Sequence, residues 1–224
     1  MRAHPRANVS GGIARAVRSV SDAAWAAGYD LVCGHADRGE GAAHRRALVA
    51  TASGVVCELG VGTGRNLSWY GGVAKVVGVD PSPATLARAR RRALHAGIET
   101  ELLVARAEAL PLPDQSVDTV VASLVLCTVG SPAEALAEAR RVLAPDGQLL
   151  FYEHVRDRDP RVAARQARLT PAWRRLARGC HLDRDALGEV VSAGFVVDAL
   201  MEAPLDRAPG VLRRHLIGRV SLPT

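Results

Sequence analysis

The sequence is short of lysine and of aromatic residues, and both shortages bear on what it binds. Lys75 is the single lysine among 29 basic residues, and aromatic residues make up 4% of the chain. Arginine and alanine are abundant instead, as in proteins encoded by GC-rich genomes. The formal net charge of +6 is spread over many segments that also carry Asp and Glu, and it accompanies no nucleic-acid-binding motif. We therefore expect no nucleic-acid partner.

Long apolar runs and closely paired cysteines are also missing. No run of about eighteen apolar residues is present, so no membrane-spanning helix is predicted. The N-terminus, MRAHPRANVSGG, lacks the apolar centre of a secretory signal. Cys33, Cys57, Cys127 and Cys180 form no C-x-x-C pair, which disfavours a zinc knuckle or a thioredoxin-type site. We expect reduced thiols, no bound metal and a cytoplasmic location.

The apolar pattern predicts one α/β domain. Helices are expected at 13–28, at about 42–51, after Ser82 up to Gly97, from Ser131 to Leu143, at about 160–178, and from Asp183 to Gly194. Strands are expected at 55–59, 73–79, 100–104, 117–123, 148–153, 195–200 and 211–220, with the APDG sequence before the fifth as a turn. This alternation predicts a doubly wound, mostly parallel seven-stranded sheet with an N-terminal helical extension.

Three spaced glycines follow the first strand in the stretch VVCELGVGTGRNLSWY, residues 55–70. Gly60, Gly62 and Gly64 read G-x-G-x-G, whereas the dinucleotide fingerprint is G-x-G-x-x-G, and Arg65 stands at its third glycine position. No G-K-[ST] sequence follows, as a P-loop requires. The spacing disfavours a pyrophosphate site, and a tight turn without a ligand is the alternative.

An acid marks the end of each of the first two strands. Glu58 precedes Gly60 by two residues, where a carboxylate would repel a pyrophosphate and attract an ammonium or sulfonium centre. Asp80 ends the second strand, where it can accept hydrogen bonds from both ribose hydroxyls. A ribose, no pyrophosphate and a cationic amino-acid end describe S-adenosylmethionine, which we expect as the cofactor.

Four segments resemble class I S-adenosylmethionine-dependent methyltransferases, in the ubiquinone/menaquinone-biosynthesis-like (type 11) branch. They are VVCELGVGTGRNLSWY, VVGVDPSPATLARARRRA, ARAEALPLPDQSVDTVVASLVLCTV and ALAEARRVLAPDGQLLFYEHV, and the match covers about residues 50–155 without a gap. A looser similarity to phospholipid-type and thiol S-methyltransferases continues through GCHLDRD towards the C-terminus. The resemblance implies a Rossmann-like methyltransferase fold. The expected organisation is a flexible tail at 1–12 and one domain at 13–224, with a helical cap (13–53), a cofactor-binding core (54–155) and a substrate-side segment (156–224).

The resemblance also implies roles for residues at matching positions. The cofactor-binding residues would be Glu58, Gly60, Gly62, Gly64, Asp80, Pro81, Ser82, Ala107, Glu108, Ser123 and Leu124. The acid and glycines of the first motif would organise the loop under the methionine end. The second-motif residues would hold the ribose and flank the adenine. The backbone of Ala107 and the carboxylate of Glu108 would meet the adenine amine, and the last two residues would lie near the methionine moiety.

Catalytic groups are sparser, because a sulfonium methyl is already activated and mainly needs an acceptor held in line. His154, after the fifth strand, is the candidate general base, with a pocket-shaping histidine as the alternative. Glu153 would orient it or be solvated. Cys127 is expected to be a buried core residue rather than a substrate contact. His181 beside Cys180 does not make a metal site on its own, so none is assigned.

The substrate side carries weaker signals. Trp25, Tyr29 and Trp173 could line an apolar pocket or simply pack. The arginine-rich stretch at 156–178 fits a lid, a lipid contact or a solvated helix face, so peripheral membrane contact stays open. We expect methyl transfer to a small, apolar or amphipathic acceptor at carbon, oxygen, nitrogen or sulfur. A non-catalytic cofactor-binding subunit and a nicotinamide-dependent oxidoreductase are the rivals, and the oligomeric state is undetermined.

Overall fold

The computed structural model describes residues 39–223. The expected tail at 1–12, the helix at 13–28, and Trp25, Tyr29 and Cys33 lie outside the described residues. The elements in chain order are α2 (Glu40–Val49), β1 (Gly54–Leu59), the 3-10 helix η1 (Leu67–Trp69), β2 (Val73–Asp80), α3 (Pro83–Ala93), β3 (Thr100–Val104), β4 (Val117–Ser123), α4 (Pro132–Val142), β5 (Leu143–His154), α5 (Pro160–Leu176), α6 (Ala186–Ser192), β6 (Val196–Glu202), the 3-10 helix η2 (Gly210–Leu212) and β7 (His215–Ser221).

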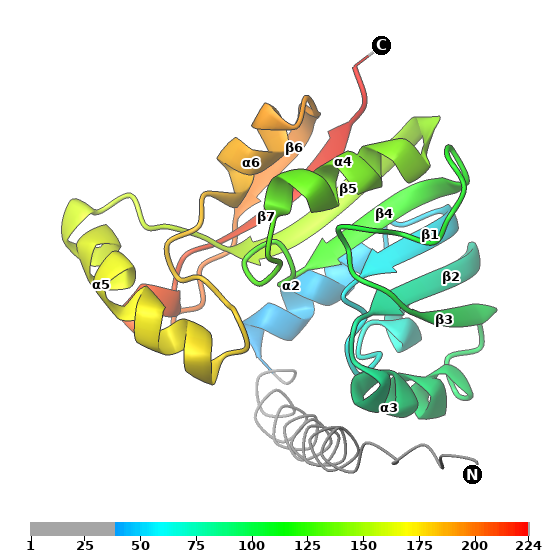
Figure 1. The fold of residues 1–224 in the computed structure, drawn as a ribbon, viewed down its shortest axis with the longest axis horizontal. Helices are drawn as coiled ribbons and strands as arrows, with labels where there is room; N and C mark the ends of the chain where they lie inside the picture. The colour runs from blue at the N-terminus through cyan, green and yellow to red at the C-terminus, as the bar shows by residue number, and fades with distance from the viewer. Residues whose placement is uncertain (1–38, 224) are drawn as a thin grey trace, which may run out of the picture.

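The seven strands form one sheet in the order β3-β2-β1-β4-β5-β7-β6, which confirms the expected seven-stranded, mostly parallel architecture (Figure 1). β1 to β5 pair in parallel, whereas β7 runs antiparallel to both of its neighbours. The chain leaves β1 towards β2 and β3, then returns to add β4 on the other side of β1. Strand order therefore reverses at β1 and β4, which is where open α/β sheets bind ligands.

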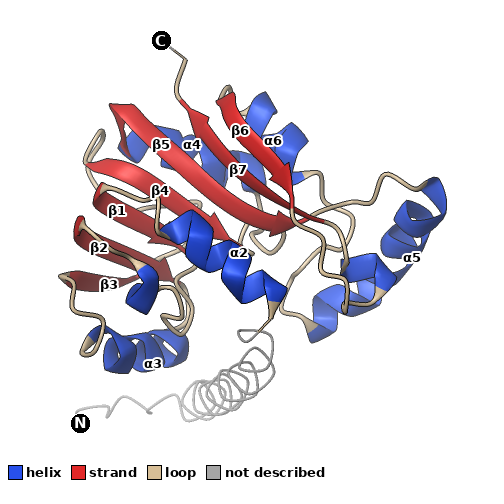
Figure 2. Ribbon diagram, turned by 180° about the vertical axis from the view of Figure 1, so that it is seen from behind, coloured by secondary structure: helices blue, strands red, loops and turns tan. Residues whose placement is uncertain are grey.

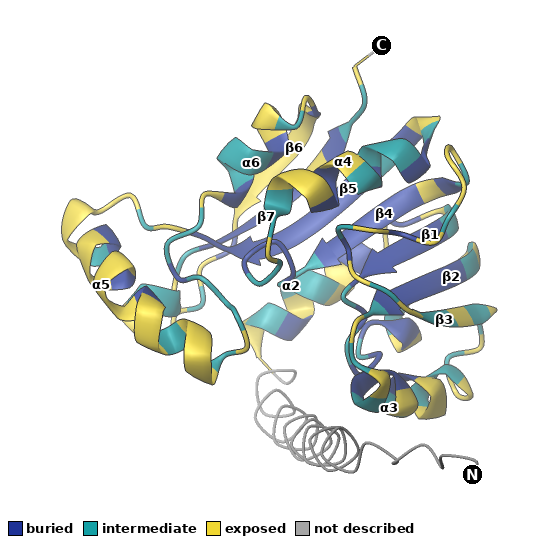
Figure 3. Ribbon diagram, in the orientation of Figure 1, coloured by how far each residue is buried: buried dark blue, intermediate teal, exposed yellow. Residues whose placement is uncertain are grey.

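Helices cover both faces of the sheet (Figures 1 and 2). On one face α4 and α6 pack their buried residues, such as Leu136 and Val190, against Leu59, Val120 and Phe151. The opposite face is covered by residues of α2, η1 and α3 in a second cluster. Burying both faces explains why the central strands are continuous apolar runs. Along the edge, β6 is exposed over its whole length (Figure 3).

Local sequence signals explain most helix starts. The Ser82 and Ser131 side chains accept hydrogen bonds from the third residue of their helices, and a proline follows each as the first helical residue. The prediction for α6 was wrong at its start, because Asp185 is the N-cap and accepts from the N–H of Gly188. Asp183 instead accepts a hydrogen bond from the Thr170 hydroxyl, which a sequence pattern does not reveal.

The end of the chain and the start of β5 also differ from expectation. β5 begins at Leu143, and its register with β4 jumps from Val117↔Leu143 to Thr119↔Gln148, so the APDG residues form an irregularity within the strand rather than a separate turn. The strand expected at 211–220 begins later than predicted. Gly210–Leu212 forms a 3-10 helix, and β7 starts at His215.

The arginine-rich segment forms α5, which stands out from one end of the sheet (Figure 1). Few of its residues are buried. One of them is Gln166, whose side-chain amide donates hydrogen bonds to the carbonyls of Val155 and Val211. Leu169 and Leu176 are exposed on it. Among the described residues, no helix is both long and apolar enough to cross a membrane.

Candidate active site

The glycine loop leaves β1 at the carboxyl edge of the sheet, and all three glycines have left-handed backbone angles, with φ between 55° and 79°. A Cβ on Gly60 would lie 2.7 Å from Val125 Cγ2, and one on Gly64 would lie 2.8 Å from Leu67 Cδ1. A Cβ on Gly62 meets nothing closer than the Gly60 carbonyl at 3.7 Å. At Gly62 no other atom of the described residues comes within 4 Å of this Cβ position, so a ligand can approach the backbone closely there.

Glu58 is buried, at 2% exposure, and holds the loop from below. Its Oε1 accepts from the Asn66 amide at 2.8 Å and its Oε2 from the Tyr70 hydroxyl at 3.0 Å. Burial raises the pKa of Glu58 to about 7, although these two hydrogen bonds oppose the shift. Through these two hydrogen bonds Glu58 holds the chain that follows the glycine loop, as expected. Asn66 and Tyr70 were not singled out from the sequence, because nothing in the spacing shows that they fold back on Glu58.

The raised pKa of Glu58 predicts a pH effect on stability. An acid whose folded-state pKa lies above its unfolded value destabilises the fold once it is ionised, so the cost is absent below about pH 4.5 and complete above about pH 7. Glu58→Gln removes this titration. Between about pH 5 and about pH 8 the variant should therefore gain about 2–3 kcal/mol of unfolding free energy relative to wild type.

Urea unfolding at both pH values measures this gain. The control is Glu101→Gln on the surface, whose side chain pairs with Lys75. A difference between Glu58→Gln and wild type that does not change with pH would contradict an ionisable, destabilising Glu58.

Asp80, at the end of β2, lies beside the glycine loop. Its Oδ2 accepts from the Gly62 N–H at 3.2 Å, and its Oδ1 accepts from the Ser82 N–H at 2.8 Å and from the Thr85 hydroxyl at 3.1 Å. Burial raises its pKa. A carboxylate has about four acceptor sites, so one remains for a ribose hydroxyl. Pro81 and Ser82 follow directly, at the start of α3.

The adenine-side residues lie beyond β3. Ala107 is buried, and the Glu108 carboxylate accepts from Arg106 and from the N–H groups of Gly130 and Ser131. Burial opposes the ionisation of Glu108, but these hydrogen bonds outweigh it and lower the pKa of Glu108. Glu108 thus ties the loop before α4 to this side of the site, and its expected contact with adenine stays a prediction.

β4 ends at Ser123, next to the glycine loop. The Ser123 hydroxyl is buried without a hydrogen-bond partner within residues 39–223. Leu124 takes a left-handed backbone angle, φ 59°, and its N–H donates to the Tyr152 carbonyl. A buried hydroxyl with no partner is costly, so it indicates a group that a ligand would satisfy. Together with the free side of Gly62, this hydroxyl fits the expected cofactor.

Glu153 has a role that the sequence did not reveal. It is fully buried, and its carboxylate accepts from the N–H groups of Val125, Leu126 and Cys127 at 2.7, 2.8 and 3.2 Å. The prediction that it orients His154 or is solvated was therefore wrong. Burial raises its pKa to about 7 while the backbone hydrogen bonds oppose this. Glu153 therefore fixes the backbone of the segment after β4.

His154, the expected base, ends β5 and is 95% buried (5% exposed). Its Nε2 lies 2.9 Å from the Cys180 sulfur, and its Nδ1 is buried without a hydrogen-bond partner in the described part of the chain. Cys127 is buried as expected, but its sulfur lies 4.0 Å from that of Cys180. The contact with Cys127, and then that with His154, lowers the pKa of the Cys180 thiol against the effect of burial, and the contact with Cys180 raises that of Cys127. His154 as a general base stays a prediction.

The His154 ring also contacts the His215 ring edge-on, with centroids 6.0 Å apart. The Tyr152 ring stacks on His215 with centroids 5.1 Å apart, and the His44 ring centroid lies 6.3 Å from that of Tyr152. Burial lowers the pKa of His215 to about 4, so this ring is neutral near pH 7. Sequence analysis missed His44 and His215, because their positions in α2 and β7 carry no motif.

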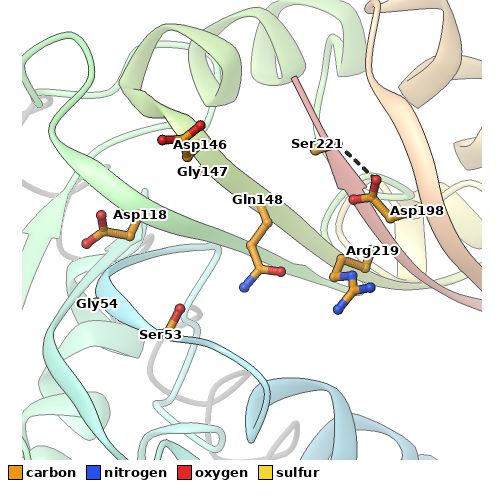
Figure 4. Close-up of a pocket in the computed structure, with 9 residues that line it drawn as sticks. All are labelled: Ser53, Gly54, Asp118, Asp146, Gly147, Gln148, Asp198, Arg219 and Ser221. Carbon is orange, nitrogen blue, oxygen red and sulfur yellow. Dashed lines mark hydrogen bonds between the residues drawn. The ribbon is translucent and has the colours of Figure 1, made fainter. Parts of the chain in front are cut away.

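A cavity of about 670 Å³ lies away from this site, at the opposite end of the parallel strands (Figure 4). Asp118 is the second residue of β4 and Asp146 lies in the irregular part of β5, while Asp198 accepts a hydrogen bond from the Ser221 hydroxyl. The Asp118 carboxylate accepts from the Val55 N–H. The Asp118 and Asp198 carboxylates hold a backbone N–H and a side-chain hydroxyl at this end of the sheet, so the cavity is separate from the site at the carboxyl ends of the parallel strands.

The site therefore combines a glycine turn above one acid with a second acid at the neighbouring strand end. With the Ser123 hydroxyl, which has no partner among the described residues, these are the features expected of a class I S-adenosylmethionine-dependent methyltransferase. Comparisons agree. The methyltransferase domain family matches residues 57–151. The human thiol S-methyltransferase TMT1B is 34% identical over 179 residues, which cover 75% of this chain and 71% of that protein. The chain belongs to this family of methyltransferases, and its cofactor is S-adenosylmethionine.

Other relatives cover less. The rat thiol S-methyltransferase TMT1B is 38% identical over 142 residues, 62% of this chain, and the match spans 58% of the rat protein's length. The phosphatidylethanolamine N-methyltransferase of Cereibacter sphaeroides is 37% identical over 124 residues, covering 54% of this chain and 61% of that protein. The solved structure of a geranyl diphosphate methyltransferase in complex with S-adenosylmethionine has a TM-score of 0.64 at 14% identity, covers 82% and 85% of the two chains, and shows the fold alone.

Proposed function

We propose that this protein transfers the methyl group of S-adenosylmethionine to a small, apolar or amphipathic acceptor, and that a thiol is the first acceptor class to test. The observation that carries the proposal is the hydrogen bond from the Gly62 N–H to the Asp80 carboxylate. It makes Asp80, the acid expected to bind the ribose, and the glycine turn parts of one site. The thiol is supported by the relatives, since rat, mouse and human proteins similar to this chain are named thiol S-methyltransferases.

The chain's own residues position the reactants. Glu58 holds the turn through Asn66 and Tyr70, and Asp80 offers an acceptor for the ribose. Glu153 fixes the backbone after β4, where an acceptor would approach along the sheet edge. Bound S-adenosylmethionine supplies an activated methyl group, so in-line positioning accounts for much of the rate. A proton must be removed only if the acceptor arrives protonated.

Two further expectations belong to this proposal. The acceptor is a small molecule, and the thiols at Cys127 and Cys180 work in their reduced form, as in a cytoplasmic protein.

Isothermal titration calorimetry with S-adenosylhomocysteine, with NAD in parallel, tests the cofactor. We expect micromolar binding of S-adenosylhomocysteine and none of NAD. Binding of NAD alone would point to an oxidoreductase, and binding of neither would remove the main support for the proposal.

An acceptor screen follows, starting with alkyl and aryl thiols, then quinone-like phenols and aminolipids. Formation of S-adenosylhomocysteine with a thiol supports the proposal. Cofactor binding without turnover on any acceptor, even at high enzyme concentration, favours the non-catalytic subunit.

A further inference from the structure

Two thiols and one imidazole meet at the acceptor side of the site. Cys127 follows β4, His154 ends β5 and Cys180 lies between α5 and α6. One donor atom from each of these residues lies within 4.8 Å of the other two. The sulfur–sulfur distance is 4.0 Å and the shorter sulfur–nitrogen distance is 2.9 Å. A tetrahedral Zn²⁺ requires about 3.8 Å between two thiolate sulfurs and about 3.6 Å between sulfur and nitrogen, so small side-chain rotations bring all three donors into range.

The backbone around the cluster is held by bonds that do not involve its donor atoms. The His181 N–H donates to the Cys127 carbonyl at 2.7 Å. The Arg184 guanidinium donates to the carbonyls of Leu126 and Val129, and the Arg156 N–H donates to the Arg184 carbonyl at 2.9 Å. The segment that carries Cys180 is thus fastened to the ends of both β4 and β5. Three ligands held this way form a site before any ion arrives, which reduces the cost of binding one.

One polar atom of the cluster has no hydrogen-bond partner within the described residues. His154 is 95% buried, and its Nδ1 makes no hydrogen bond there. The Trp173 indole is directed at the cluster, because its hydrogen bond to the Cys180 sulfur is among the contacts that lower the pKa of that thiol. Buried polar groups are normally satisfied, so the His154 Nδ1 indicates that something beyond the described residues completes this part of the site. If Cys127 and Cys180 only filled the hydrophobic core, the His154 imidazole would not need to lie 2.9 Å from the Cys180 sulfur.

We propose that Cys127, His154 and Cys180 bind one soft d¹⁰ cation, with Zn²⁺ as the probe, and leave its fourth position open. Two thiolates and one imidazole are the donor set that zinc accepts, and three protein ligands with an open position are typical of catalytic zinc. The expectation of no metal, drawn from the missing C-x-x-C spacing, did not take into account that residues from three separate segments meet. Within residues 39–223, Cys127, His154 and Cys180 meet from different elements rather than from one motif.

The open position deepens the proposed function and rests on it. Asp80 ends β2, the glycine loop follows β1, and β4 and β5 come next in the sheet. Neighbouring strands are about 4.8 Å apart, so we infer that the cluster lies beside the methyl-bearing end of the bound cofactor. An acceptor thiol that takes the fourth position releases its proton to solvent and becomes a bound thiolate. The sulfur lone pair forms the new bond to the methyl carbon. The carbon–sulfur bond of the sulfonium breaks, and its electron pair stays on the departing S-adenosylhomocysteine sulfur.

The test uses the full chain, reduced and freed of metal by a chelator. Titration with Co²⁺ should show one equivalent with the visible bands of a tetrahedral ion and thiolate-to-cobalt charge transfer, and Zn²⁺ should displace it. Cys127→Ser, Cys180→Ser and His154→Gln should each weaken Zn²⁺ binding by at least about 100-fold. Cys57→Ala, at a buried free thiol of β1, is the matched control and should keep the wild-type spectrum. Calorimetry with S-adenosylhomocysteine shows that every variant is folded.

Each outcome is decisive. A folded, reduced protein that binds S-adenosylhomocysteine but shows no thiolate-to-cobalt band overturns the site, and so does binding that all three ligand variants retain. If the metal binds, addition of ethanethiol should change the charge-transfer band, and an unchanged band overturns the open fourth position. Metal binding without methyl transfer to any thiol would instead count against the proposed function, because cobalt binding is measured without acceptor or cofactor.

Discussion

Asp80→Ala should weaken S-adenosylhomocysteine binding roughly 30- to 1,000-fold. Asp80 is the acid placed to accept a ribose hydroxyl, and hydrogen bonds to a charged group contribute about 1.5–3 kcal/mol each. The same carboxylate also holds the N–H groups of Gly62 and Ser82, so its removal loosens the glycine turn as well. A total loss of about 2–4 kcal/mol corresponds to the stated change in Kd. Isothermal titration calorimetry measures it directly.

The matched control for Asp80 is Asp198→Asn, at the opposite end of the strands, where the carboxylate bonds only to the Ser221 hydroxyl among the contacts described for it. Its affinity for S-adenosylhomocysteine should equal that of wild type. A folded Asp80→Ala that binds as tightly as wild type would remove Asp80 from the cofactor site. A loss of binding in Asp198→Asn would indicate that S-adenosylhomocysteine binds in the cavity of about 670 Å³ that Asp198 lines.

Glu153→Ala should destabilise the fold by about 4 kcal/mol or more, which is a large part of the 5–15 kcal/mol typical of a domain. The fully buried carboxylate accepts three backbone N–H groups, and each buried donor left without a partner costs about 1–3 kcal/mol. Glu153→Gln keeps one oxygen but turns an amide N–H towards the Cys127 N–H, so it should lose about 1–3 kcal/mol. Urea unfolding measures both variants.

Glu99→Gln serves as the comparison for Glu153. Glu99 is 70% exposed and lies 3.7 Å from Lys75, so removal of its charge should change the unfolding free energy by at most about 0.5–1 kcal/mol. The cobalt spectrum of Glu153→Gln should also weaken, since the backbone of Cys127 is no longer held. If Glu153→Gln matched Glu99→Gln in stability, the three hydrogen bonds would not hold the segment after β4.

Local chemistry explains which parts of the fold could be predicted. The boundaries of β3 and β4 follow from short apolar runs, and Ser82 and Ser131 act as N-caps because a hydroxyl before a proline satisfies a free helix N–H. Where a longer-range partner competes, prediction failed. Asp183 accepts a hydrogen bond from the Thr170 hydroxyl, and Asp185 is the N-cap of α6 instead. The start of β5 depends on its irregular pairing with β4.

The architecture and the cofactor class could be predicted from the amino-acid sequence, because alternating apolar periods, spaced glycines and an acid at each strand end are local features with local causes. The surroundings of these features depend on the three-dimensional fold. Glu58 closes on Asn66 and Tyr70, Glu153 turns inward to three N–H groups, and Cys180 crosses from a distant segment to meet Cys127 and His154. Such contacts depend on how helices and loops pack across the sheet edge, and packing between distant segments leaves no periodic or spacing signal in one chain.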